Sequence, residues 1–131
     1  MKITAVSAIA IVALPLLAWT LPASTADQMT AHPMKTAMGM VLTDDKGMTL
    51  YTFDQDKGGM SACSGGCTQN WPPLTAAADA KPQGDWTLIT RDDGMHQWAF
   101  KGRPLYTFSK DGKPGDTTGE GFKGMWHAAT P

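Results

Sequence analysis

The sequence has little cysteine, histidine, excess charge or helical periodicity. Only two cysteines and three histidines occur among 131 residues, and no serine–histidine–acid or cysteine–histidine signature is visible. The formal net charge is −1, so the chain lacks the basic footprint that binds nucleic acid or an anionic membrane. No amphipathic helical period of useful length follows residue 26. These absences argue against an enzyme, a nucleic-acid-binding protein and a helical bundle.

The N-terminal stretch is a candidate export signal. After Lys2 the next charged residue is Asp27, and the residues between them are largely apolar. Ser24 and Ala26 supply small residues at the −3 and −1 positions of a cleavage site. The sequence therefore predicts a signal peptide over 1–26, with an uncleaved membrane anchor as the alternative, because the apolar run is nearly long enough to span. No cysteine lies near the cleavage point, so we expect a periplasmic or secreted protein that leaves the membrane after cleavage.

The rest of the chain repeats itself at a constant offset of 55 residues. Residues 39–71 align without a gap on residues 94–126, which indicates a tandem repeat of one supersecondary unit. The matched pairs are Gly39/Gly94, Met40/Met95, Lys46/Lys101, Gly47/Gly102, Leu50/Leu105, Tyr51/Tyr106, Thr52/Thr107, Phe53/Phe108, Asp56/Asp111, Gly66/Gly121 and Trp71/Trp126. The chain is too short for two independent cores, so we expect both units to share one core.

Short β-type runs and turns alternate along each unit. Residues 27–38 carry no such alternation and are predicted to be a flexible N-terminal segment. In the first unit, apolar runs at 40–43 and 48–53 flank an Asp/Gly-rich turn at 44–47, which predicts a hairpin. The second unit repeats this pattern after an added strand at 86–90. We therefore predict a mainly β fold, with one antiparallel domain over 39–131 built from repeats at about 39–74 and 86–128 and related by approximate two-fold symmetry.

The repeated skeleton carries a Tyr-x-Phe-x-x-Asp motif twice, each followed by a tryptophan. The motif residues are Tyr51, Phe53, Asp56 and Trp71 in the first unit and Tyr106, Phe108, Asp111 and Trp126 in the second. Alternation along a strand places the tyrosine and phenylalanine on one face, and the acid that follows can accept hydrogen bonds from turn N–H groups. We expect these aromatic side chains to be core, with a ligand cleft as the alternative. We expect each tryptophan to seal the end of its own unit.

Cys63 and Cys67 are the only cysteines. An exported compartment favours their oxidation, and Gly65-Gly66 lets so short a ring bend. Three residues separate the two cysteines, whereas redox-active dithiols usually have two residues between them. We expect a structural disulfide, with redox chemistry, metal ligation and a free pair as alternatives.

Methionine is unusually frequent, with nine in the chain. His32, Met34, Met38 and Met40 crowd into one short segment, and thioethers are soft ligands suited to Cu(I). The alternative is packing, because Met40 has a repeat counterpart and methionine fills irregular cores well. We therefore expect no cofactor, with copper as the alternative.

Acidic loops raise a second metal, calcium. The oxygen ligands available are Asp54, Asp56, Asp111, Asp116 and Glu120. An EF-hand loop beginning at Asp54 would have glycine where its bidentate glutamate belongs, so the pattern fails in detail. We expect these acids to lie in solvated turns.

The combination of motifs resembles a known family. The matching elements are Leu50-Tyr-Thr-Phe-x-x-Asp56, Cys63-x-Gly-x-Cys67 and Trp71-Pro-Pro-Leu74, then Gly102-x-Pro-Leu-Tyr106 with Asp111, Gly121 and Trp126. Together they resemble the exported bacterial family known as secreted repeat of unknown function, also described as predicted lipoproteins with a YxFxxD-type motif. This resemblance implies an exported β-repeat domain and no particular activity. The chain differs from the lipoprotein members in lacking a lipidation cysteine.

We conclude from the sequence that the protein is a non-catalytic, exported domain with a structural or binding role in the cell envelope. Neither His96 nor His127 belongs to the repeated skeleton, which argues against catalysis. The expected partner is an envelope component or a small ligand, not nucleic acid or membrane. A periplasmic copper-binding protein and a thiol–disulfide redox protein are the alternatives.

Overall fold

The computed structural model describes residues 1–2, 10–13, 15 and 31–131. Most of the signal peptide predicted over 1–26 lies outside these residues. Within the described part, no helix has the length and apolar character needed to cross a membrane. The helical elements among residues 31–131 are a four-residue α-helix, α1 (Cys67–Asn70), and a 3-10 turn, η1 (Phe122–Gly124).

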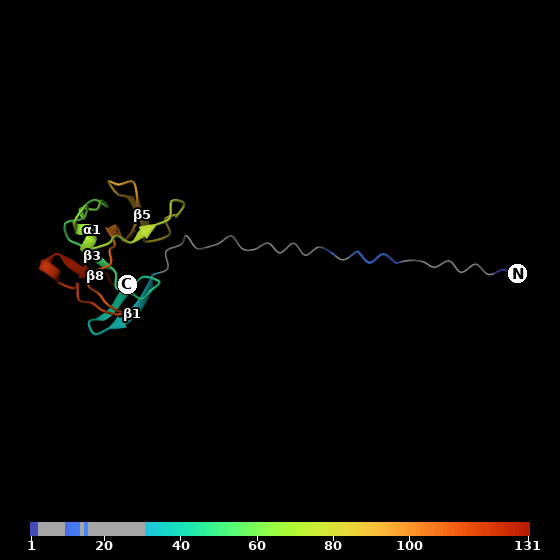
Figure 1. Cartoon of the computed structure of the whole chain (residues 1–131), viewed down its shortest axis with the longest axis horizontal. Coiled ribbons are helices and arrows are strands. Elements are labelled where there is room, and N and C mark those ends of the chain that lie inside the picture. The colour runs from blue at the N-terminus through green and yellow to red at the C-terminus, as the bar shows by residue number, and fades with distance from the viewer. Residues whose placement is uncertain (3–9, 14, 16–30) are drawn as a thin grey trace.

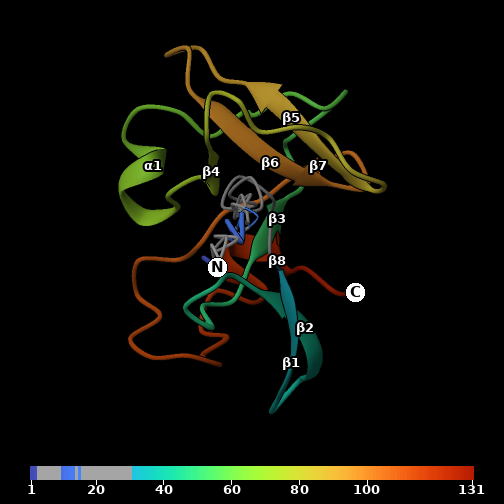
Figure 2. The same ribbon diagram turned by 90° about the vertical axis from the view of Figure 1, so that its right-hand side faces the viewer.

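The fold is mainly β, as predicted, and every strand pair is antiparallel. The strands are β1 (His32–Thr36), β2 (Gly39–Thr43), β3 (Tyr51–Phe53), β4 (Thr75–Ala76), β5 (Trp86–Thr90), β6 (His96–Phe100), β7 (Arg103–Pro104) and β8 (Trp126–Ala128). They form a β1–β2 hairpin, a central β3–β8 pair and a sheet of β4, β6 and β5 in which β7 also pairs with β6. Figures 1 and 2 show the two outer sheets on opposite sides of β3 and β8.

Strand β1 corrects the sequence prediction at the N-terminal side. It lies inside the segment predicted to be flexible and pairs with β2 over its whole length, from His32 opposite Thr43 to Thr36 opposite Gly39. Pro33 interrupts the β pattern in the sequence, but an edge strand tolerates a proline because one side of it needs no ladder partner. The strand predicted as an addition to the second unit, β5, is therefore the counterpart of β1, and both units begin with a hairpin.

The two units interlock at a symmetric backbone junction. The Tyr51 N–H donates to the Tyr106 carbonyl at 2.8 Å, and the Tyr106 N–H donates back to Tyr51 at 2.9 Å. Strand β3 of the first unit pairs on its other side with β8 from the end of the second unit. Further bonds recur with the repeat offset: Leu74 N–H to the Leu105 carbonyl, and Ala129 N–H to the Leu50 carbonyl. The chain therefore has the approximate two-fold symmetry that its repeat predicts.

Strand alternation divides the core into two clusters around this junction. Tyr51 and Tyr106 are fully buried in an aromatic cluster, while the preceding Leu50 and Leu105 are fully buried in an aliphatic cluster with Leu42. Successive strand residues face opposite sides, so each unit contributes to both clusters. Neither cluster is built from one unit alone.

Candidate functional site

The aromatic side chains of the repeated motif form a continuous stack of four rings. Trp71 and Trp126 lie face to face at its centre, with ring centroids 3.7 Å apart and planes 1° from parallel. Phe53 stacks on the outer face of Trp126 at 4.2 Å, and Phe108 stacks on the outer face of Trp71 at 4.1 Å. The tryptophans therefore join the two units instead of sealing the end of each, because each phenylalanine packs on the tryptophan of the other unit.

The two tyrosines meet the stack edge-on. Tyr51 lies 5.3 Å from Trp71 at 79°, and Tyr106 lies 5.1 Å from Trp126 at 87°. Both pairs are T-shaped, and because each indole already has a stacked ring on either face, the tyrosines contact the indole edges. Five of the six motif rings are buried in the interior, whereas Phe53 is half-buried and also lines a small cavity.

Each tyrosine hydroxyl reaches the motif aspartate of the other unit. The Tyr51 hydroxyl donates to Asp111 Oδ2 at 2.6 Å, and the Tyr106 hydroxyl donates to Asp56 Oδ2 at 2.7 Å. The sequence places each acid five residues after its own tyrosine, but the structure exchanges the partners across the symmetry axis. This exchange ties the two units together with a pair of charge-assisted hydrogen bonds.

The same aspartates also order the loops that follow them. Asp56 Oδ1 accepts the Ala62 N–H at 2.6 Å, and Asp111 Oδ1 accepts both the N–H and the hydroxyl of Thr118. Burial raises the pKa of Asp56, although the bonds from Ala62 and Tyr106 act in the opposite direction. Burial also raises the pKa of Tyr106 to about 12, so its hydroxyl stays protonated and can donate at neutral pH.

Arg91 is a buried residue that sequence reasoning missed. Its guanidinium donates to Ser61 Oγ at 2.9 Å, to Gln97 Oε1 at 2.7 Å and to the Cys63 carbonyl. Ser61 continues the network to the Tyr106 hydroxyl at 2.6 Å. Arg91 stands in a polar turn after β5, where an arginine is ordinarily exposed, so local sequence carries no sign of its burial.

Cys63 and Cys67 form the predicted disulfide, with Cα atoms 5.4 Å apart. Cys63 is fully buried against the aromatic cluster, and its carbonyl is held by Arg91. Cys67 begins α1 and is half-buried. The bridge therefore anchors the Gly-rich loop of the first unit to the core.

The hairpin β1–β2 separates the candidate copper ligands. Met34 stands opposite Val41 and Met40 stands opposite Lys35, so Met34 and Met40 occupy opposite faces. Met38 lies in the turn between the strands and is exposed. His32 shares the face of Met34 and has its Nε2 3.4 Å from Asp45. Two of the four predicted ligands thus share a face, and copper binding stays a prediction.

The acids considered for calcium are held in separate local contacts. Asp116 accepts the N–H groups of Gly112 and Lys113, Glu120 accepts the Ala128 N–H, and Asp54 contacts His127. Among the described residues, no group of three or more histidine, cysteine or acidic side chains is arranged to hold a metal ion. Asp116 thus stabilises a turn, whereas Asp54 and Glu120 contact residues of β8.

His127 is the histidine with the strongest acidic surroundings. Its Nε2 lies 2.9 Å from Asp54 Oδ2, and its Nδ1 lies 3.7 Å from Glu120 Oε1. The hydrogen bond that His127 donates to Asp54 is the main reason that the pKa of His127 is raised above 6.5, and burial lowers this pKa by less. Folding therefore shifts the protonation equilibrium of His127 toward the imidazolium form.

Replacing Asp54 by asparagine is expected to return the pKa of His127 toward 6.5. In the wild type, a raised folded-state pKa means that this contact stabilises the protein below pH 6.5 and that the stabilisation is lost as pH rises through the folded-state pKa. The effect on stability is small because both side chains are about half exposed. Titration of the His127 ring protons by NMR in both proteins checks the shift; an equal pKa in both would contradict the role of Asp54.

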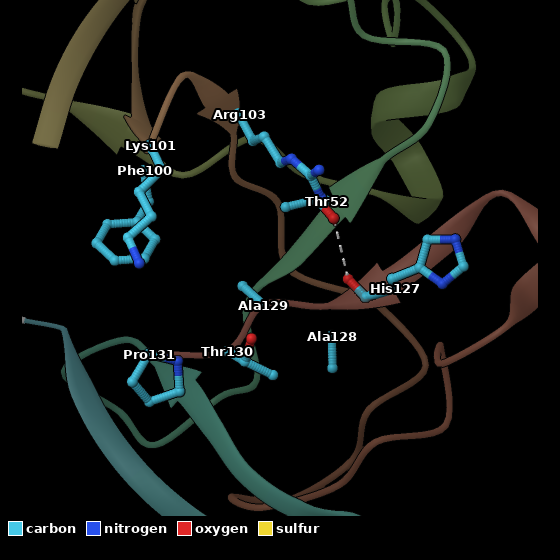
Figure 3. Close-up of a pocket in the computed structure, with 9 residues that line it drawn as sticks. All are labelled: Thr52, Phe100, Lys101, Arg103, His127, Ala128, Ala129, Thr130 and Pro131. Atoms are coloured by element: carbon cyan, nitrogen blue, oxygen red, sulfur yellow. Dashed lines mark hydrogen bonds between the residues drawn. The ribbon is translucent and has the colours of Figure 1, made fainter. Parts of the chain in front are cut away.

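An open cavity lies on the outer side of the β3–β8 pair, beside the β6–β7 turn (Figure 3). It has a volume of about 330 Å³ and is lined by Thr52, Phe100, Lys101, Arg103, His127, Ala128, Ala129, Thr130 and Pro131. A smaller cavity of about 130 Å³ adjoins it and shares Thr52 and Arg103. Sequence reasoning did not select Lys101 or Arg103, although the arginine replaces a methionine of the other repeat and so breaks the pattern.

A third cavity, of about 490 Å³, lies between the disulfide loop and the β5–β6 turn. Its lining residues are Ser64, Gly65, Thr68, Arg91, Asp92 and Asp93. The Arg91 guanidinium donates its hydrogen bonds within the buried network. The charged groups that remain accessible at this cavity are therefore the carboxylates of Asp92 and Asp93. This cavity and the one beside the β6–β7 turn therefore differ in their charged lining residues, which are Asp92 and Asp93 here and Lys101 and Arg103 there.

Comparison with known families matches two segments of the chain, residues 33–75 and 87–130, to one family. These bounds agree with the structure, because the first segment includes β1 and the second includes β5. Searches of curated proteins and of solved structures each found no match. The matched segments cover most of the chain and contain both copies of the Tyr-x-Phe-x-x-Asp motif, so the protein belongs to the family described as secreted repeat of unknown function.

Proposed function

We propose that the protein is an exported, non-catalytic domain with a structural or binding role in the bacterial cell envelope. The observation that carries this proposal is that the side chains of the repeated motif contact one another in the core. Its rings stack on one another and its acids bind the tyrosines of the opposite unit. The repeated motif residues are therefore used to hold the two units together, which leaves binding to the surface around them.

The placement of the titratable side chains also supports a non-catalytic role. Asp56 and Asp111 are each held by a tyrosine hydroxyl and a turn N–H. Groups engaged in this way position loops, whereas a general acid or base must reach a substrate proton. The family description as secreted supports export, and we propose the periplasm or the exterior as the destination.

Thiol–disulfide exchange is disfavoured by the burial of Cys63. An attacking thiolate needs access to a sulfur atom, and Cys63 is fully buried in a loop whose Cys63 carbonyl accepts from Arg91, while Cys67 is half-buried. Reduction followed by repeated exchange would require this loop to leave the core. We therefore propose that the disulfide is structural.

The double substitution Cys63→Ala and Cys67→Ala tests the structural role of the disulfide. We expect the variant to keep its fold and to lose about 2 kcal/mol of unfolding free energy, because a five-residue ring restricts the unfolded chain only slightly. Urea unfolding measures this loss. The wild type should also fail to catalyse reduction of a disulfide-bonded protein by dithiothreitol. Efficient turnover in that assay would refute the non-catalytic proposal, and complete unfolding of the variant would refute the minor structural role.

A further inference from the structure

The two repeats differ in what covers their equivalent turns. Gly47 in the first unit and Gly102 in the second have the same backbone φ, +79°. The first turn is covered, because Gly115 donates to the Gly47 carbonyl at 3.1 Å and Pro114 packs directly against Gly47. The second turn is open, since no heavy atom lies within 4 Å of where a Gly102 Cβ would be. The approximate symmetry of the fold is therefore broken at the cavity beside Gly102.

The open turn also carries more positive charge than the covered one. Both turns have a lysine, Lys46 and Lys101, but the residue after the glycine is Met48 in the first unit and Arg103 in the second. In the part of the chain that the structure describes, neither Lys101 nor Arg103 forms an ion pair with a carboxylate. The cavity thus has two cations that no acidic side chain neutralises by direct contact.

The acidic side chains near Arg103 already have other hydrogen-bond partners. Asp54 and Asp56 line the smaller adjoining cavity together with Arg103. Asp54 pairs with His127, and Asp56 accepts the Tyr106 hydroxyl and the Ala62 N–H. These contacts leave the guanidinium of Arg103 available to another anion.

The remaining lining of the cavity combines an aromatic ring with hydroxyl groups. The Lys101 ammonium lies 5.1 Å from the centroid of the Phe100 ring, and Figure 3 shows both side chains at one side of the cavity with Arg103 above it. The Thr52 hydroxyl makes only a long contact, 3.5 Å, to the His127 carbonyl, so it can bind a ligand. A volume of about 330 Å³ is in the range of small-molecule sites.

We propose that this cavity binds a small organic anion, with a carboxylate or phosphate group at Arg103 and Lys101 and an apolar body against Phe100. The planar guanidinium presents paired N–H donors that match the oxygens of either group. The apolar body would cover Phe100 and the Ala128–Ala129 backbone. This inference rests on the binding role proposed above and names the chemistry of the ligand.

Binding of benzoate and of inorganic phosphate at low ionic strength provides the test, followed by NMR of backbone amides. We expect saturable shifts at Gly102, Thr52 and Thr130, with benzoate binding more tightly because it also contacts Phe100. Arg103→Met and Lys101→Gln should each weaken binding about tenfold or more, as expected for loss of a charge-assisted hydrogen bond. Methionine already occupies the equivalent position of the other repeat, so Arg103→Met should keep the fold.

Lys46→Gln is the matched control, because it removes the same charge from the equivalent but covered turn. Unchanged binding in this variant, together with loss in the two cavity variants, supports the site. Equal weakening in all three variants, or shifts that never saturate, would show general charge screening and overturn it. Binding confined to vesicles of phosphatidylglycerol, with none to benzoate or phosphate, would also overturn it. The dithiothreitol assay described above tests the non-catalytic role separately, and its result does not depend on whether this cavity binds an anion.

Discussion

Alanine at either Trp71 or Trp126 is expected to lower the stability of the whole domain by about 3–5 kcal/mol. Both side chains are 3% exposed, and each packs between its partner tryptophan and a phenylalanine of the stack. Removing one indole leaves a large cavity and unstacks the ring on either side of it. A loss of this size is a large share of the roughly 5–15 kcal/mol that stabilises a small domain. Thermal and urea unfolding should show one cooperative transition at a much lower midpoint.

The other aromatic residues supply graded controls. Phe108→Ala should approach the cost of the tryptophan variants because Phe108 is 4% exposed, whereas Phe53 is half-buried and should cost less. Trp86→Ala tests the loss of a tryptophan outside the stack, at the partly exposed face of β5, and should be milder still. If Trp71→Ala and Trp126→Ala melted near the wild-type temperature, the stack would not be the stabilising core. Two separate transitions would show that the units fold independently.

Two fragments divided between the units are expected to be unfolded alone and to fold when mixed. Residues 81–84 provide the place to divide the chain, because Lys81, Pro82, Gln83 and Gly84 are exposed. The first fragment would keep Trp71 but lose its stacking partner Trp126, and it would keep β3 but lose β8. Each fragment would also leave its buried tyrosine hydroxyl without the aspartate of the other unit. Neither half can therefore bury its own core, as is usual for repeat architectures.

Near-UV circular dichroism measures this assembly directly. Each fragment alone should lack the aromatic signal of a packed core, and an equimolar mixture should recover it with a concentration-dependent midpoint. Mixing one fragment with itself is the control for nonspecific association. A stable, cooperatively folded single fragment would contradict the shared core.

Sequence alone identified the features that depend on local geometry. The constant offset predicted two related units, alternation assigned Tyr51 and Leu50 to opposite faces, and the short Gly-containing ring predicted the Cys63–Cys67 bridge. It failed at β1, where Pro33 and the lack of apolar alternation concealed a strand. That strand is recognised by what it pairs with, because its hydrogen bonds to β2 stabilise it and its own residues favour no structure strongly.

Only the tertiary structure decided which copy of the motif each side chain contacts. Two identical motifs contain no information that distinguishes pairing within a unit from pairing between units, so the exchange of Tyr51 to Asp111 and of Tyr106 to Asp56 had to be observed. The burial of Arg91 also depends on a loop 28 residues away in sequence. The openness of the turn at Gly102 depends likewise on where the loops of the other unit pass. Local sequence determines the strands and turns of this protein, whereas its core contacts and its cavity arise from how the two units close around their axis.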